Sequence, residues 1–333
     1  MPDKLNVGIV GLGLVGASAG LALHRFPEKV TVVGHDRSPE VASTAKRLGA
    51  VDRTEWNLIS TVAKADRIIL ALPLEEMRDT LDAIKQDLRP GCVIIDTANV
   101  KGPVMEWAAE LLPPEVHFVG GHPIVLTDRL DVDGARANLF ENRLFCLTPD
   151  NRTDDTAVRL AADVIEAMGA KPFFMDAQEH DGLAAAVEHL PSLLAAALLT
   201  VTSRSAGWQD MRKLAGNQYY ASTLMLSGSG KDAIAGPRAN REHVVHWLDA
   251  LIEELSAYRE QLLAEEPTDL VADIDRGLAA GHGWLAASLS GNWDAEGPRP
   301  EVPTAGSAFR DMFFGGLGRH RERTKQGEQK ARK

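Results

Sequence analysis

Val7-Gly-Ile-Val-Gly-Leu-Gly-Leu-Val-Gly16 passes from an apolar, strand-like run directly into closely spaced glycines, and this stretch decides the fold. Gly11 permits a tight turn out of the strand, Gly13 leaves room for a pyrophosphate, and Gly16 lets helix and strand pack closely. Residues 17–23 predict a helix whose N-terminal N–H groups face the phosphates. The stretch therefore predicts a dinucleotide site contacted by Gly11, Leu12, Gly13, Leu14, Val15 and Gly16.

An acidic residue at the end of the next apolar run supports this prediction. Val30-Thr-Val-Val33 leads into Gly34-His-Asp36, which places Asp36 twenty residues beyond Gly16. A carboxylate at this point accepts a hydrogen bond from the adenosine ribose 2′-hydroxyl and repels a 2′-phosphate. The expected cofactor is therefore NAD rather than NADP, although the neighbouring Arg37 weakens the preference slightly.

Length, composition and charge agree with an ordinary two-domain enzyme. The chain has 333 residues, of which 44% are hydrophobic and 25% charged, as in globular proteins. The net charge is −11, yet residues 319–333 are strongly basic, so the rest of the chain is acidic. An acidic body argues against nucleic acid as a partner, and the basic tail is expected to be solvated and disordered.

The two cysteines and the apolar runs favour a cytoplasmic protein. Cys92 and Cys146 lie inside apolar runs without a pairing pattern, which predicts buried thiols in a reducing compartment. The apolar N-terminal run is explained by the nucleotide site rather than by an export signal. No apolar run is expected to span a membrane, because Glu188 and His189 interrupt residues 183–199.

The alternation of short apolar runs and helical segments predicts a doubly wound parallel sheet with helices on both faces over residues 1–175. Further strands are expected at 67–72, 92–96, 117–120, 144–147 and 172–175, with helices near 39–48, 76–87, 103–112 and 154–168. Residues 176–290 form an all-helical domain with helical patterns at 179–203, 239–263 and 269–290. Residues 291–333 are predicted to be a loop and the basic tail.

The first helix of the second domain is unusual. Residues 182–199 are apolar almost all round, which is typical of a buried central helix. Pro191 cannot donate a hydrogen bond to the carbonyl of Val187, so the helix should kink there and open a polar notch at Glu188 and His189. His189 is therefore a candidate site residue, with a hydrogen-bonded core histidine as the alternative.

Residues just after the parallel strands are the other candidates, because ligands of doubly wound sheets bind at the carboxyl ends of the strands. These residues are Leu72-Pro73, residues 96–101 and Gly120-Gly-His-Pro123. His122 is held between glycines and a proline, and a neutral imidazole suits a base that takes a hydroxyl proton as hydride leaves carbon. His243 and His246, one helical turn apart, lack a third ligand, so no metal site is expected.

At these positions the chain resembles the prephenate and arogenate dehydrogenase family. The resemblance covers roughly residues 5 to 265 and rests on the sequences at 11–16, 96–103, 119–124, 138–140, 147–149, 179–181, 189–191 and 239–241. It implies a Rossmann-type nucleotide-binding domain followed by a helical dimerisation domain, and hence a homodimer. It also implies NAD-dependent oxidation at C4 of a cyclohexadienol with loss of carbon dioxide, in tyrosine biosynthesis.

The resemblance also implies roles for individual residues. His122 matches the family base, Asn99 stands where a serine usually hydrogen-bonds that base, and His189 matches a substrate-site histidine. Lys101 is expected near the nicotinamide or the substrate. Thr127 and Arg241 are expected to bind substrate, and Leu72 and Pro73 to line the cofactor site.

One difference from the family leaves the substrate open. The segment that usually carries an arginine for a substrate carboxylate falls on Tyr220-Ala-Ser-Thr-Leu-Met225, which contains none. Possible substitutes are Arg129, Arg204, Arg212, Lys213 and Arg238. Two alternative functions also stay open: a β-hydroxyacid dehydrogenase, and a catalytically weak NAD-binding dimer with a regulatory role.

Overall fold

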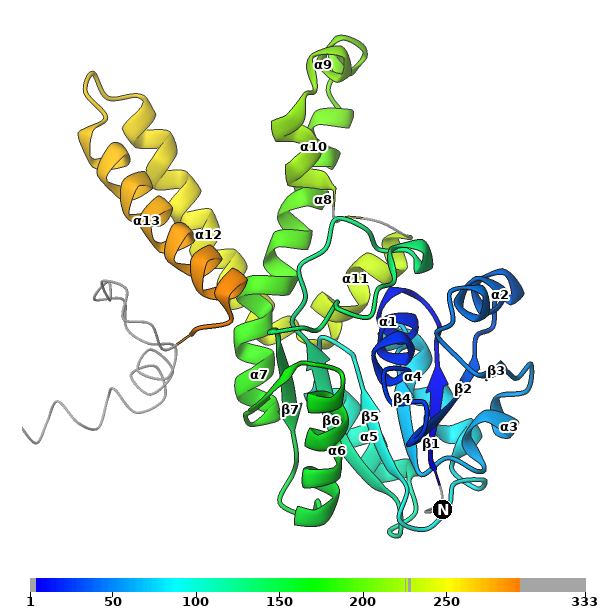
Figure 1. Cartoon of the computed structure of the whole chain (residues 1–333). Helices are drawn as coiled ribbons and strands as arrows, with labels where there is room; N and C mark the ends of the chain where they lie inside the picture. Colours follow the sequence, from blue (N-terminus) through cyan, green and yellow to red (C-terminus); the bar gives the residue numbers. More distant parts are fainter. Residues whose placement is uncertain (1–3, 225, 227–228, 294–333) are drawn as a thin grey trace, which may run out of the picture. The chain divides into compact units, whose positions relative to one another are not determined.

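The computed structural model describes residues 4–224, 226 and 229–293 (Figure 1). The chain divides into a compact unit that ends at Glu265 and a second unit from Glu266 onward. The basic tail and nearly all of the predicted 291–333 segment lie outside the described residues. The change from strands to helices near residue 175 therefore falls inside the first unit, and the predicted domain boundary there stays a prediction.

An eight-stranded sheet in the order β3-β2-β1-β4-β5-β6-β7-β8 forms the centre of the first unit. The strands are β1 (Leu5–Val10), β2 (Val30–His35), β3 (Arg53–Thr54), β4 (Arg67–Leu70), β5 (Val93–Asp96), β6 (His117–Pro123), β7 (Leu144–Thr148) and β8 (Lys171–Phe174). Only β3 was not predicted, because two residues show no periodicity.

The order 3-2-1-4-5-6 with parallel pairing confirms the predicted doubly wound sheet, but β7 runs antiparallel to β6. A parallel connection needs a crossover, usually a helix. The segment between β6 and β7 contains only a short 3-10 turn, Val132–Gly134, so the chain turns back on itself. β8 then pairs parallel to β7. The prediction of an all-parallel sheet is wrong for these last two strands.

Helices cover both faces of the sheet, as predicted. The helices are α1 (Leu14–Leu23), α2 (Pro39–Arg47), α3 (Leu58–Val62), α4 (Leu74–Ile84), α5 (Gly102–Leu111) and α6 (Asp155–Ala167). One apolar cluster joins Ile69 and Ile95 to α1, α2 and α6, and a second joins Ile68 and Ile94 to α3, α4 and α5. Because successive strand residues face opposite sides, continuous apolar runs bury both faces.

The first β–α turn shows why its glycines are needed. Gly11 has φ +88°, and a Cβ there would lie 2.1 Å from the carbonyl oxygen of Ala71. A Cβ on Gly16 would lie 1.9 Å from the carbonyl oxygen of Gly11. Both positions therefore exclude every other residue, as the sequence predicts for the tight turn and the close helix packing.

The remaining described segments are helical (Figure 1). They are α7 (Ala177–Ala184), a π-helical turn (Ala185–His189), α8 (Leu190–Ser203), α9 (Trp208–Leu214), α10 (Asn217–Thr223), α11 (Gly230–Ala239) and α12 (Arg241–Leu262) in the first unit, and α13 (Thr268–Ser290) in the second. The predicted disturbance before Pro191 takes the form of the π-helical turn. Such turns change the backbone register and frequently occur at functional sites.

Helix α8 is not the buried central helix that its composition predicts. Within this chain only Ala195 of α8 is buried, while Leu194 and Val201 are 47% and 68% exposed. The continuous helix Ala177–Ser203 has 27 residues and contains an 18-residue window with a mean hydropathy of 1.6, so by length and composition alone it could cross a membrane. The predicted burial of α8 is wrong within this chain, whereas the prediction that the segment does not span a membrane stays a prediction. The chain by itself leaves a large apolar helix surface uncovered.

Candidate active site

The glycine turn offers space for a dinucleotide. A Cβ on Gly13 would meet nothing within 4 Å, so this position borders open space at the first turn of α1. The side chains of Leu12 and Leu14 are buried and that of Val15 is half-buried, which leaves backbone N–H groups to face a phosphate. The residues present fit the pyrophosphate of a dinucleotide.

Asp36 is fixed beside this turn at the carboxyl end of β2. Its Oδ2 accepts a hydrogen bond from the backbone N–H of Leu12 at 2.8 Å, and its Oδ1 accepts one from Ser38, also at 2.8 Å. Each oxygen keeps a second lone pair for a ribose hydroxyl. The neighbouring Arg37 is 77% exposed and pairs with Glu76.

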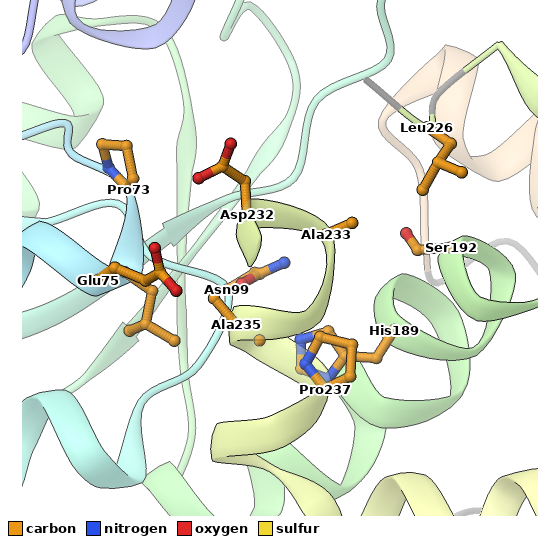
Figure 2. Close-up of a pocket in the computed structure, with 12 residues that line it drawn as sticks. Pro73, Glu75, Asn99, His189, Ser192, Leu226, Asp232, Ala233, Ala235 and Pro237 are labelled. Atoms are coloured by element: carbon orange, nitrogen blue, oxygen red, sulfur yellow. The ribbon is translucent and has the colours of Figure 1, made fainter. Parts of the chain in front are cut away.

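A cavity of about 250 Å³ lies where the strand ends meet the helices. Pro73 and Asn99 line it from the loops after β4 and β5, His189 from the π-helical turn, and Asp232 and Gly236 from α11. Figure 2 shows these side chains arranged around one space. The structure thus brings together Pro73, Asn99 and His189, which the sequence predicts as site residues in separate segments.

His189 presents an unused hydrogen-bonding atom near this cavity. His189 is 1% exposed, and its Nε2 atom is buried without a hydrogen-bond partner. The Asn240 amide oxygen faces His243 Nδ1 at 2.8 Å, which directs the amide nitrogen toward His189 Nδ1 at 3.4 Å. Nδ1 is therefore the acceptor and Nε2 carries the hydrogen. Burial lowers the pKa of His189 to about 4, so the ring is a neutral donor.

Gly236 keeps the space beside His189 open. A Cβ at this position would lie 2.9 Å from His189 Nε2 and 3.4 Å from Asn99 Oδ1. The glycine of α11 therefore lies between the two polar side chains. A ligand group that entered here could accept a hydrogen bond from Nε2 and donate one to the Asn99 oxygen.

His122 lies near the end of β6 and is 6% exposed. Its Nδ1 is 2.9 Å from Nε2 of His180, and the two rings meet edge to face. Burial, reinforced by the neighbouring His180 and Lys101, holds the pKa of His122 well below its usual value. The ring is thus neutral near pH 7 and can accept a proton.

Two residues that the sequence analysis left without a role complete this arrangement. Nδ1 of His180 lies 2.9 Å from Oδ1 of Asp181. That carboxylate also accepts the backbone N–H groups of Lys101 and Gly102, at 2.7 and 2.8 Å. Glu179-His180-Asp181 supported the family resemblance, but nothing local shows that His180 contacts a residue 58 positions earlier.

Lys101 does not occupy the predicted position at the substrate. Its side chain is fully enclosed, pairs with Asp96 and donates to the Gly121 carbonyl at 2.6 Å. Burial lowers the pKa of the Lys101 ammonium, while Asp96 opposes the shift. Lys101 is predicted to lie near the nicotinamide or the substrate, and in this structure its ammonium is turned into the core toward Asp96 and Gly121.

Three other predicted site residues have contacts that differ from their expected roles, which stay predictions. The partner of His122 is His180 rather than Asn99, whose oxygen lies toward Gly236 instead. Thr127 Oγ1 hydrogen-bonds the backbone of Arg129 within its own loop. Arg241 lines a separate cavity of about 260 Å³ beside the start of α5. Neither Thr127 nor Arg241 lies among the described residues that line the cavity at His189.

The cation that would replace the family arginine is not found at this cavity. Its described lining includes the carboxyl side chains of Glu75 and Asp232 but no lysine or arginine. Of the five candidates, Arg129 pairs with Asp131, and Lys213 pairs with Asp210. The structure does not choose among the five candidates.

Comparison with known proteins identifies the family of this chain. Residues 19–173 match "Prephenate dehydrogenase, nucleotide-binding domain", and residues 176–275 match "Prephenate dehydrogenase, dimerization domain". Cyclohexadienyl dehydrogenase of Zymomonas mobilis is 30% identical over 252 residues, which cover 76% of this chain and 82% of the relative. The chain belongs to the prephenate dehydrogenase family.

Other members of the family are similar along most of the chain. Prephenate dehydrogenase of Bacillus subtilis is 29% identical over 272 residues, 80% of this chain and 72% of the relative. The solved prephenate dehydrogenase of A. aeolicus, in complex with hydroxyphenyl propionate and NAD⁺, has a TM-score of 0.74 at 26% identity and covers 83% of this chain and 97% of its own. Synechocystis arogenate dehydrogenase reaches a TM-score of 0.64 at 25% identity, with coverage of 85% and 99%.

Family membership confirms the predicted fold class, a Rossmann-type sheet followed by a helical dimerisation domain. It also confirms that the chain is a dehydrogenase with a nucleotide-binding domain. The β-hydroxyacid dehydrogenase alternative is thereby set aside. The matched segments meet between residues 173 and 176, where the last strand ends.

Proposed function

We propose that this member of the prephenate dehydrogenase family oxidises a cyclohexadienyl substrate at C4, with loss of carbon dioxide, by using NAD and His122 as the base. The observation that carries the proposal is the state of His122. Its Nδ1 is occupied by His180, whereas Nε2 forms no hydrogen bond and is not among the enclosed polar atoms of the described residues. A nitrogen of a neutral ring with no hydrogen bond among the described residues therefore lies near the end of a central strand.

The cofactor proposal rests on the glycine turn and on Asp36. The open space over Gly13 takes the pyrophosphate, and the fixed carboxylate of Asp36 receives the ribose hydroxyls. Bound there, NAD supplies a hydride acceptor. Gly11, Leu12, Gly13, Leu14, Val15 and Gly16 are proposed to contact it through the backbone, with Leu72, Pro73 and Arg37 at its border.

The chemistry of the residues follows from their protonation states. His122 Nε2 takes the proton of the C4 hydroxyl, and the O–H electron pair forms the C4 carbonyl as the C–H pair leaves as hydride. The bond pair of the departing carboxylate enters the ring and releases carbon dioxide. The resulting phenolate oxygen regains the proton, so the ring ends as a phenol. Formation of the aromatic ring drives the reaction.

His189 and Asn99 are proposed to orient the substrate. The neutral Nε2–H of His189 can donate a hydrogen bond to a carboxylate, carbonyl or hydroxyl oxygen. A ligand without such an oxygen would leave this buried donor unpaired, which makes the free energy of binding less favourable. The relatives are named for prephenate, cyclohexadienyl and arogenate substrates. Prephenate and arogenate share the ring and differ in the side chain, and Asn99 in place of the usual serine and the missing arginine leave the choice between them to experiment.

The uncovered face of α8 supports a homodimer. Its exposed apolar side chains include Leu194 and Val201, and the segment lies in the part that matches the dimerisation domain. A second copy would remove this surface from water. We also propose that the enzyme acts in the cytoplasm, where its free, buried Cys92 and Cys146 stay reduced.

The test is a direct assay. Purified protein with saturating NAD is mixed separately with prephenate and arogenate, which carry the C4 hydroxyl, and with 4-amino-4-deoxyprephenate, which carries an amine there, while NADH absorbance is followed. Turnover of one substrate is expected, and His122→Asn should lower kcat by about 10²-fold or more. Calorimetric NAD binding should survive in that variant. NAD binding without turnover of any of the three would instead favour the regulatory alternative.

A further inference from the structure

His122 is one end of a chain of hydrogen bonds that runs through His180 to Asp181, here termed the histidine relay. The two contacts are 2.9 Å each, and all three residues are buried. The relay joins β6 of the sheet to α7 of the helical segment. The positions of the protons along the relay depend on Asp181, because a carboxylate can only accept hydrogen bonds.

Both carboxylate oxygens of Asp181 accept backbone hydrogen bonds. Its two oxygens receive the backbone N–H groups of Lys101 and Gly102 at the start of α5, where the helix dipole favours negative charge. His180 Nδ1 must therefore donate to Oδ1 of Asp181. In the neutral ring, Nε2 of His180 is then an acceptor, and the hydrogen between the two rings belongs to Nδ1 of His122.

We propose that His180 and Asp181 are positioning residues that fix His122 as the tautomer with a proton on Nδ1 and a free lone pair on Nε2. This inference rests on the proposed role of His122 as base. Without the relay, neutral imidazole would divide between two tautomers, only one of which can take a proton at Nε2. A fixed ring orientation adds to the effect, because a base must meet its proton at a defined angle.

The relay also compensates for the burial of His122. The titratable groups around this ring are His180, Lys101 and His189, and all three oppose a positive charge on it. When Nε2 takes the substrate proton, the Nδ1–H of the imidazolium points at His180, whose other nitrogen faces the Asp181 carboxylate. The Asp181 carboxylate thus stabilises the positive charge that forms on His122 during the reaction, while the His122 ring is neutral before the reaction.

The first test reads the tautomer directly, without substrate. In protein labelled with ¹⁵N at histidine, the His122 signals are assigned by their loss in His122→Asn. We expect a pyrrole-type Nδ1 and a pyridine-type Nε2 near neutral pH. The reverse assignment would mean that His180 donates to His122, and it would overturn the proposal. Because no turnover is needed, this result is independent of whether the proposed reaction is correct.

The second test uses matched variants on α7. His180→Leu should lose the tautomer preference and lower kcat by about 10²-fold or more, with the NAD dissociation constant unchanged. In His180→Gln the amide can accept a hydrogen bond from His122 and donate one to Asp181. This variant should therefore retain much of the tautomer preference and of kcat. Glu179→Gln, an exposed neighbour, is the control and should behave as the parent.

The pH profile of kcat/KM separates positioning from simple structural support. In His180→Leu the acidic limb should shift, because the His122 ring loses both its hydrogen-bond partner and a neighbouring ring that opposes its positive charge. An unchanged tautomer and an unchanged limb in a folded His180→Leu protein would overturn the proposal. Should that variant fail to fold, His180→Gln and the spectrum of the parent protein still decide the question.

Discussion

Lys101 and Asp96 form an ion pair in which both side chains are completely enclosed. The ammonium also donates to the Gly121 carbonyl, and Asp96 accepts the N–H groups of Ala98 and Gly121. Gly121 directly precedes His122. The pair therefore fixes the strand end that carries the proposed base, and its contacts are with the backbone of that strand.

Removal of one member of this pair should be costly. Lys101→Met leaves the Asp96 carboxylate buried without its cation and should lower the free energy of unfolding by about 3–5 kcal/mol. Urea denaturation measures this. The matched control is Arg78→Met, which breaks an exposed pair with Glu110 and should cost at most about 1 kcal/mol. Equal losses in the two variants would contradict the assigned role.

Gly236→Ala should damage substrate binding while leaving the cofactor site intact. The added Cβ would lie 2.9 Å from Nε2 of the buried His189, so the ring must move. We expect KM for the substrate to rise about ten-fold or more, which corresponds to about 1.4 kcal/mol. Gly230→Ala on the same helix has nothing within 4 Å of its Cβ and is the control. A normal KM in Gly236→Ala would argue against substrate at His189.

Asp36→Asn should reduce the preference for NAD. The substitution removes the charge that repels a 2′-phosphate and disturbs the hydrogen bonds to Leu12 and Ser38. KM for NAD should rise by about ten-fold, and the ratio of kcat/KM for NADP to that for NAD should increase. Steady-state kinetics with both cofactors measure this, with the exposed Glu40→Gln on α2 as control. An unaltered ratio would exclude Asp36 from the ribose site.

Stability should fall as pH drops through the range of the buried histidines. Burial lowers the pKa of His189 from 6.5 to about 4, so the unfolded chain binds more protons between these values. Neutral His189 thus contributes stability above pH 6.5 that is lost toward pH 4, up to about 3 kcal/mol. Urea titrations across this range should show a smaller pH slope in His189→Gln. The exposed His282→Gln should retain the slope of the parent protein.

The strands and the cofactor turn could be predicted because their signals are local. Continuous apolar runs such as Val93–Asp96 mark strands buried on both faces, and Gly11 is required by the conformation of its own turn. Strand direction is not local. The run at Leu144–Thr148 is equally apolar in either direction, and the segment before it decides that β7 is antiparallel.

The site could be predicted only in part, for the same reason. His122 and Asn99 were found because residues after parallel strands gather at one edge of the sheet. Lys101 follows the same strand, but its side chain turns back toward Asp96, which position along the chain does not reveal. The role of His180 depends on a contact between segments 58 residues apart. The exposure of α8 could not be predicted either, because its apolar composition does not show whether this chain itself covers the helix.

Asp181 makes contacts in three directions, through its carboxylate to α5 and to His180, and through its backbone carbonyl to Asn240 at 2.6 Å. Asn240 ends α11 and in turn faces His189. The sheet, the proposed base His122 and the proposed substrate residue His189 are therefore joined at Asp181. A change that separated α7 from α5 would disturb the contacts of His122 and His189 together, because both depend on Asp181.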